Sequence, residues 1–397
     1  LGDLGGSLLL VGLIVGLLAM VLGPWAVRLG LAMRAWCLAY PAYLAAVLDP
    51  FTSLFRYLVP LFPLVAVIAG AAGGPKWLVL NGLDRALFFQ WFTSHRNPCF
   101  LIGSSIGGWR FAAIAQGQEA YDRFELAYVA QRYGKNPSPA EVTRESARIM
   151  DIFLGSNGTE AVLNHPVFRM NLLAVRCRGL FKHEGRTALV PAMIMAASAN
   201  AVSRKTLRLF FTRSLFYDPR TIPPFFNMDQ FPLQKIALTA RNLSDALLAS
   251  GSIPLVMEGV VDPAGAKPGM YRDGGMIDYH LDLPFGTQGL VLFPHFRARI
   301  IPGWLDKMLP WRKPAAGNME QVVLLCPSED FINRLPGGRI PDREDFVIYR
   351  GRDQERFRAW EKVIETSRTL GDEFLELVEG DGIRKRVRPL EDLLRPA

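Results

Sequence analysis

The chain has 397 residues, 50% of them hydrophobic, and its 45 basic and 37 acidic residues give a formal net charge of +8 at pH 7. This length allows one large domain with additions or two smaller ones. No interleaving of aromatic and basic residues and no zinc-ligand spacing indicates DNA or RNA binding, so we expect no nucleic-acid partner. The basic balance favours an anionic membrane surface as partner, and a solvated basic surface is the alternative.

A hydrophobic segment occupies residues 1–34. Residues 4–27 contain no charged side chain in 24 positions, and about 20 apolar residues span a bilayer core. Residues 8–27 are therefore predicted to form a transmembrane helix, and Arg28 and Arg34 place the following chain in the cytoplasm by the positive-inside rule. A buried hydrophobic helix, or an N-terminus wrongly assigned to the gene, is the alternative, with the protein then cytoplasmic.

An apolar connecting segment, residues 35–60, leads to the first predicted strand. Its run 38–48 is too short to span a membrane and fits an interfacial, re-entrant or core helix. Residues 64–68 read Leu-Val-Ala-Val-Ile, which is typical of a buried parallel strand. A globular region is therefore expected to begin near residue 61.

Glycines separate this strand from a predicted helix over residues 78–89. Residues 70–77 between them read Gly-Ala-Ala-Gly-Gly-Pro-Lys-Trp. Glycines at the mouth of a helix leave backbone N–H groups free to point at an anion, and proline suits a first helical turn. An acyl-transfer enzyme needs such donors where its oxyanion develops. A plain glycine-rich turn is the alternative.

A G-x-S-x-G motif follows, formed by Gly103, Ser105 and Gly107. It lies between the apolar run 99–102, a predicted buried strand, and a predicted helix over 109–116. On a sharp strand-to-helix turn, the hydroxyl of the central serine is exposed toward a substrate. The local context therefore favours a nucleophilic serine.

The rest of the chain alternates between predicted helices and strands. A buried Ala/Met-rich helix is expected at 189–201. The aromatic, proline-rich stretch 210–230 is interpreted as an irregular lid, a pocket wall or ordinary core. The remaining predicted helices are 121–132, 139–153 (capped by Ser138) and 354–378, and the remaining strands are 170–175, 290–293 and 322–326. This alternation predicts an α/β fold with a mostly parallel central sheet.

Four cysteines are widely spaced and form no C-x-x-C pattern: Cys37, Cys99, Cys177 and Cys326. They are interpreted as reduced packing residues in a reducing compartment. They indicate no metal site, and we expect no cofactor.

A second short motif, Asp273-Gly274-Gly275, begins 168 residues after Ser105. With Gly73-Gly74-Pro75-Lys76, the G-x-S-x-G motif and the small-residue segment 249–254, it makes about residues 62–295 resemble the patatin-like phospholipases. The resemblance implies a patatin-like three-layer α/β sandwich and a serine acyl hydrolase with a Ser–Asp dyad. Ser105 would be the nucleophile and Asp273 its base. The resemblance further implies supporting roles for seven other residues: Gly73 and Gly74 as oxyanion-hole donors, with Lys76, Gly103, Gly107, Gly274 and Gly275 beside them.

The sequence also departs from that family. Ala71, Ala72 and Trp77 replace residues of its usual D-G-G-G-x-R-G loop, and the Asp-Gly-Gly turn does not continue toward N-x-P. An ordinary aspartate has a pKa near 3.9 and is a poor base for a serine. Asp273 must therefore be desolvated or held rigidly against Ser105. We expect the two side chains within hydrogen-bond reach at the carboxyl ends of neighbouring strands.

Two histidines leave a Ser-His-Asp scheme open. His280 follows Asp273 by seven residues, and His295 lies late enough in the chain to fit the triad order of α/β-hydrolases. A lone histidine is more often structural, so we expect neither to act as the general base.

These observations predict a lipid acyl hydrolase that cleaves phospholipid-type carboxylic esters and is associated with a membrane through its N-terminus. The expected organisation is a catalytic domain over residues 61–350, followed by an amphipathic helix and basic tail over 351–397. An esterase or thioesterase on soluble acyl substrates is one alternative. A membrane-anchored, catalytically weak binding protein is another.

Overall fold

The computed structural model describes residues 65–379 and 386–390. The chain divides into two compact units, one comprising Pro63–Leu377 with Arg386–Ala397 and the other Leu1–Phe62 with Val378–Lys385. The predicted transmembrane helix 8–27 and the connecting segment 35–60 lie outside the described residues. Within the described ranges, no helix has the length and apolar character needed to cross a membrane.

The larger unit is built on one sheet that contains the nine strands of the described chain, and its main path runs β5-β4-β3-β2-β1-β8-β9. Five of the eight strand pairs are parallel, which confirms the mostly parallel sheet. The strands are β1 (Val65–Gly70), β2 (Cys99–Ser104), β3 (Phe168–Cys177), β4 (Phe211–Tyr217), β5 (Leu233–Ala237), β6 (Val260–Val261), β7 (Met270–Asp273), β8 (Leu290–Pro294) and β9 (Val322–Leu325).

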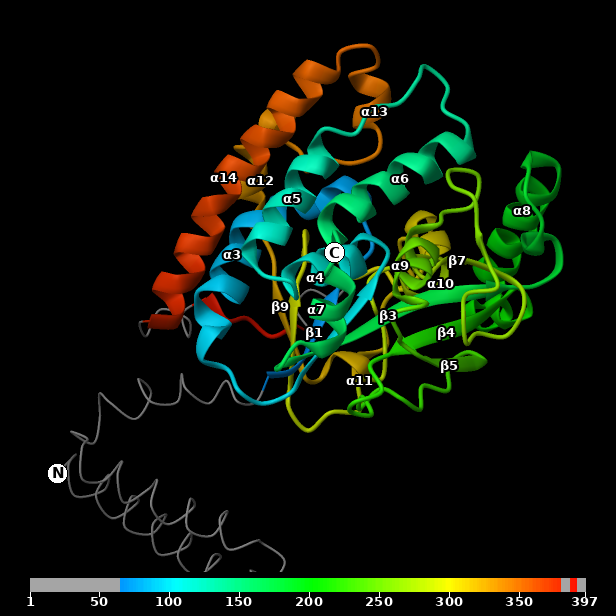
Figure 1. Ribbon diagram of the computed structural model, residues 1–397, viewed down its shortest axis with the longest axis horizontal. Helices are drawn as coiled ribbons and strands as arrows, with labels where there is room; N and C mark the ends of the chain where they lie inside the picture. Colours follow the sequence, from blue (N-terminus) through cyan, green and yellow to red (C-terminus); the bar gives the residue numbers. More distant parts are fainter. Residues whose placement is uncertain (1–64, 380–385, 391–397) are drawn as a thin grey trace, which may run out of the picture. The chain divides into compact units, whose positions relative to one another are not determined.

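Helices lie on both sides of this sheet, so the unit has three layers (Figure 1). The α-helices are α3 (Asn81–Phe89), α4 (Ile106–Ile114), α5 (Gln118–Val129), α6 (Pro139–Leu154), α7 (Gly158–Asn164), α8 (Arg186–Val202), α9 (Leu243–Gly251), α10 (Gly275–Asp278), α11 (Ala316–Met319), α12 (Glu329–Asn333), α13 (Asp345–Ile348) and α14 (Asp353–Glu379). The 3-10 helices include η3 (Gly74–Leu80), η4 (Trp91–Ser94), η5 (Gly179–Lys182), η6 (Arg204–Leu209), η7 (Trp304–Met308) and η8 (Pro336–Gly338).

The core of the unit lies around β1 and β2. Both strands are almost wholly buried, as expected for parallel strands covered by helices on both faces. Helix α4 packs against β1, β2 and β3. The carboxyl ends of β1 and β2 therefore open toward the starts of η3 and α4, where the two glycine-containing motifs lie.

The structure refines two sequence predictions. Of the three interpretations of 210–230, ordinary core is the one that holds for residues 211–217, because they form strand β4 with Leu215 and Phe216 fully buried. The Ala/Met-rich helix α8 is not buried all round: Leu189, Ala192 and Ala196 face the core, whereas Ile194 is 62% exposed. Met195 and Val202 are exposed as well, so apolar residues lie on both faces of this helix.

Helices α6 and α14 agree with the sequence prediction. The Ser138 hydroxyl accepts a hydrogen bond from the Glu141 backbone N–H at 3.2 Å, which caps α6. Helix α14 buries Trp360 and Val363, and the Gly82 backbone N–H in α3 donates to its Ser367 hydroxyl. These contacts join α14 to the sheet-containing unit.

Candidate active site

Ser105 occupies the turn between β2 and α4. Its backbone lies at φ 55° and ψ −129°, a conformation that residues other than glycine adopt rarely and at an energetic cost. The turn is tight, since a Cβ on Gly107 would lie 2.1 Å from the Gly70 carbonyl oxygen. Only glycine fits there. The strand, strained turn and helix predicted for the G-x-S-x-G motif are therefore confirmed.

The side chain of Asp273 is hydrogen-bonded to that of Ser105. The Ser105 hydroxyl donates to Asp273 Oδ2 at 2.9 Å, and each residue is only 4% exposed. This confirms the predicted hydrogen-bond reach. Both side chains are therefore largely buried.

The two residues do not lie on neighbouring strands, so that part of the prediction is wrong. On one edge of β3, Leu173 pairs with Ser104 of β2 in a parallel register. The next residue of β3, Ala174, pairs with Asp273 of β7 in an antiparallel register. Strands β2 and β7 therefore meet end to end along β3, and their carboxyl ends converge.

The surroundings of Asp273 tune it as a base. Burial raises the pKa of its carboxyl to about 6, while the nearby Arg343 charge and hydrogen bonds from Gly275 and Ser105 oppose the rise. The Gly275 backbone N–H donates to Asp273 Oδ1 at 2.6 Å, which fixes the carboxylate. A general base works best with a pKa near the operating pH. Asp273 is thus ionised at neutral pH yet more basic than an ordinary aspartate.

The small-residue segment at the end of α9 holds both partners. The Ser105 backbone N–H donates to the Ser250 hydroxyl at 2.8 Å, and that hydroxyl donates to the Leu173 carbonyl. The Asp273 backbone N–H donates to the Ser252 carbonyl at 3.0 Å, and the Gly274 N–H to that of Ser250. Sequence analysis singled out this segment but not the positioning role of the Ser250 hydroxyl.

The glycine loop lies beside Ser105. Gly74 has φ +56° and begins η3, and both Gly74 and Ile106 border the same cavity as Ser105. The first N–H groups of a helix have no acceptor within that helix. The N–H groups of Gly74 and Ile106 are therefore the best-placed candidate oxyanion donors, and Ile106 was missed by sequence analysis. Gly73 precedes η3 and is not part of the cavity wall.

Lys76 is directed elsewhere. Its ammonium forms an ion pair with Asp342 at 3.1 Å and lies 5.9 Å from the centre of the Phe296 ring. Burial lowers the pKa of Lys76, and the Asp342 carboxylate opposes that change. The structure therefore gives Lys76 a salt-bridged place in the wall behind the glycine loop.

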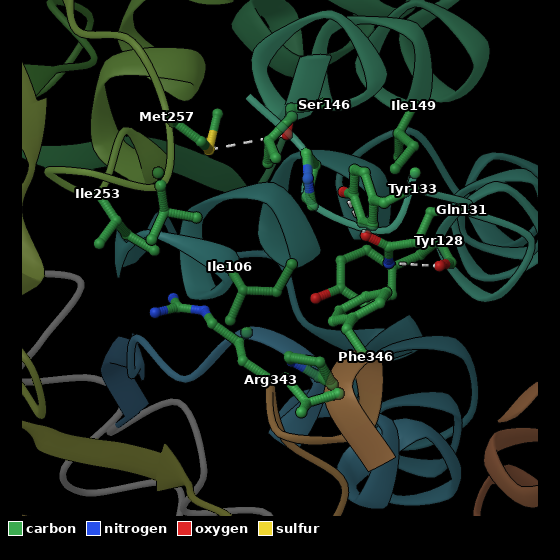
Figure 2. Close-up of a pocket in the computed structure, with 18 of the residues that line it drawn as sticks. Ile106, Tyr128, Gln131, Tyr133, Ser146, Ile149, Ile253, Met257, Arg343 and Phe346 are labelled. Carbon is green, nitrogen blue, oxygen red and sulfur yellow. Dashed lines mark hydrogen bonds between the residues drawn. The ribbon is translucent and has the colours of Figure 1, made fainter. Parts of the chain in front are cut away.

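A cavity of about 680 Å³ opens at Ser105. Its walls are largely apolar and come from α4, α5, α6, α13 and the segment after α9, as Figure 2 shows for Ile106, Tyr128, Ile149, Ile253 and Phe346. The volume falls within the range of small-molecule sites, and an apolar lining suits a hydrocarbon chain. The 210–230 stretch contributes nothing to these walls.

The two histidines are core residues. His280 and His295 are fully buried with ring centres 4.3 Å apart, and burial lowers the pKa of His295 to about 3 and that of His280 well below its usual range. The Ile301 backbone N–H donates to His280 Nδ1 at 3.0 Å. In the part of the chain that the structure describes, neither ring is hydrogen-bonded to Ser105 or Asp273.

Replacing these histidines should lower the stability of the fold and have little effect on the rate of catalysis. We expect His280→Ala and His295→Ala to lower the melting temperature, because each leaves a cavity in the core. The turnover of the folded variants should fall by less than about tenfold, since removing a true triad histidine costs several orders of magnitude. Steady-state kinetics on samples checked by circular dichroism measures both effects. A loss of roughly 10³-fold in a folded variant would favour the triad.

Substitution of Gly74 tests the glycine loop. A valine there is strained at φ +56°, and its Cβ would lie 3.2 Å from Arg343 Nε. We expect Gly74→Val to lower kcat by about 10²-fold, the effect of losing one oxyanion donor, with a smaller rise in KM. The matched control is Gly179→Val, which has the similar φ of +54° and open space around its Cα. Unchanged kcat in Gly74→Val would mean that the oxyanion is held by other groups.

No protein-family model matches this chain, and no curated protein matches its sequence.

Proposed function

We propose that this protein is a serine acyl hydrolase of the patatin-like type that cleaves carboxylic esters of lipids. The observation that carries the proposal is the buried 2.9 Å hydrogen bond from the strained Ser105 to Asp273, at the mouth of an apolar cavity. A nucleophile and base within hydrogen-bond reach, with the base held by a third group, is the arrangement that nucleophilic catalysis needs. Gly275 supplies that third group through its N–H.

The reaction proceeds in two acyl transfers. Ser105 Oγ attacks the ester carbonyl carbon while its proton passes to Asp273 Oδ2, and the N–H groups of Gly74 and Ile106 stabilise the oxyanion. The bond to the alcohol oxygen then breaks, and Asp273 returns the proton to the departing alcohol. Water attacks the acyl-enzyme, gives its proton to Asp273, and releases the fatty acid. Ser105 recovers its proton as the second tetrahedral intermediate collapses.

The cavity favours a lipid acyl group over a small one. Trp109, Ile149 and Phe346 line it, and the charged residues of the lining are Lys135, Arg343, Arg350 and Asp353. A long hydrocarbon chain gains from leaving water for such a surface. The proposal includes a membrane as the source of substrate, with the N-terminal hydrophobic segment as the anchor, on the strength of the sequence alone.

Fatty-acid release tests the proposal. Purified full chain in nonionic detergent is incubated with a panel of glycerophospholipids, short-chain esters and acyl thioesters, and products are measured by mass spectrometry. The control is Ser105→Ala, which removes the nucleophile. We expect fatty acid from long-chain esters well above the control. Release only from short soluble substrates would favour the esterase or thioesterase, and no release from any substrate would favour a binding protein.

A further inference from the structure

One arginine faces the candidate active site from a distant part of the chain. Arg343 precedes α13 and lines the same cavity as Ser105 and Gly74. Its guanidinium packs over the glycine loop: a Cβ built on Gly74 would lie 3.2 Å from Arg343 Nε. Figure 2 shows that this group reaches away from Phe346, toward the side of the cavity where Ile106 and Ile253 lie.

Several charged residues near Arg343 form ion pairs with one another. Arg339 is paired with Asp345, and Arg356 with Asp353 at 3.2 Å. Within residues 65–379 and 386–390, the Arg343 side chain takes part in no hydrogen bond or ion pair. Its charge does act on Asp273, whose pKa it holds down against the effect of burial. A half-buried guanidinium beside the reacting groups is thus left with its five donors unused.

Positive charge gathers around the same place. Lys307 lies 4.2 Å from the centre of the Tyr279 ring, and burial together with the charges of Arg343 and Lys76 lowers its pKa to about 7. Two carboxylates face these cations. Asp273 accepts hydrogen bonds from Ser105 and Gly275, and Asp342 forms an ion pair with Lys76. An anion bound here would relieve repulsion among the cations.

We infer that Arg343 binds a phosphate on the alcohol or thiol side of the scissile bond, so that the site selects phosphate-bearing acyl substrates over neutral ones. Guanidinium groups match phosphate oxygens in a two-pronged, charge-assisted geometry. Ile149 and Arg343 lie on different sides of the cavity (Figure 2), so an acyl chain bound along Ile149 would leave the leaving group on the side of Arg343. This inference rests on the proposed hydrolase function.

The test compares two lipids that differ by the phosphate. kcat/KM is measured at pH 8 for phosphatidylglycerol and for diacylglycerol with the same acyl chains, each dilute in nonionic micelles. That pH is well above the pKa of about 6 of Asp273 in the wild type, and any change in the basicity of Asp273 would act on both lipids alike. The variants are Arg343→Gln and Arg343→Lys, with Arg343→Met as a second neutral variant that keeps the aliphatic stem should Arg343→Gln fail to fold. The control is Arg358→Gln, which makes the same change in net charge at an exposed site on α14 outside the cavity.

We expect the wild type to prefer phosphatidylglycerol by at least about tenfold. Arg343→Gln should lower kcat/KM on that lipid by about 10- to 100-fold, the range for losing a charged hydrogen bond, and on diacylglycerol far less. Arg343→Lys should retain part of the preference, and Arg358→Gln all of it.

Two outcomes overturn the inference while leaving the hydrolase intact: a wild type without preference, or an equal loss on both lipids in Arg343→Gln. A third arm uses a soluble acyl-coenzyme A. If it is preferred and depends on Arg343, the phosphate belongs to a soluble substrate, and the assignment of Arg343 is supported. A wild type that hydrolyses no ester or thioester overturns the proposed function, and the inference with it.

Discussion

Asp273→Asn should abolish turnover and at the same time stabilise the folded protein at alkaline pH. Activity should fall by about 10³-fold or more, because an amide cannot accept the Ser105 proton. The geometry can be kept, since the amide oxygen can still accept the Gly275 N–H that now binds Oδ1 at 2.6 Å. The loss would therefore reflect the missing base rather than a disordered site.

The gain in stability follows from the sign of the pKa shift. Burial raises the pKa of Asp273 from 3.8 to about 6 in the folded protein, so ionisation of this group opposes folding. The penalty is fully present above about pH 6 and absent below about pH 4, and by linkage it amounts to at most about 3 kcal/mol. Asp273→Asn should thus raise the melting temperature at pH 8 and leave it nearly unchanged at pH 4.

Thermal unfolding at the two pH values, beside kinetics at pH 8, measures both effects. The matched control is Asp151→Asn in α6, an exposed carboxylate that lies outside the candidate site. If the Asp273→Asn variant were active, Asp273 could not be the base. A variant that is inactive but also less stable at pH 8 would show that the carboxylate is needed for folding, contrary to the burial argument.

Ser105→Ala should be as inactive as Asp273→Asn, and combining the two should add almost nothing. When two residues act as one catalytic unit, replacing either one already removes nearly all of the rate that the pair contributes. The alanine must still adopt the strained φ of 55°, which the Ser250 hydroxyl helps to fix through the backbone N–H. kcat for the two single variants and the double variant, corrected for spontaneous hydrolysis, measures this. Additive losses would mean that the residues contribute independently.

The local parts of the site could be predicted from the sequence, because they depend on short-range geometry. A serine between two glycines after an apolar run specifies a strand, a tight turn and a helix, and the structure has them at Cys99–Ser104 and Ile106–Ile114. The Asp-Gly-Gly turn similarly places a carboxylate at a strand end. The Ser105–Asp273 contact followed from pairing the two motifs.

The other parts of the site depend on contacts between residues far apart in the sequence, which no local sequence pattern predicts. The end-to-end meeting of β2 and β7 is set by their registers on β3. Arg343 sits in a charged loop region with no motif, and it reaches the site because the chain before α13 lies against Gly74 at the start of η3. Strand β4 was hidden by Arg213, a charged residue that reads as exposed but is fully buried against Asp278 at 2.6 Å.

Covalent labelling tests the central claim most directly. The full chain is treated with a fluorophosphonate from pH 4.5 to 8.5, and the modified peptide and the rate of its formation are followed by mass spectrometry. The account predicts a single adduct on Ser105, a rate that rises with a midpoint near pH 6 as Asp273 ionises, and no adduct in Ser105→Ala. An adduct on another residue, or a folded protein that does not react at any pH, would contradict it.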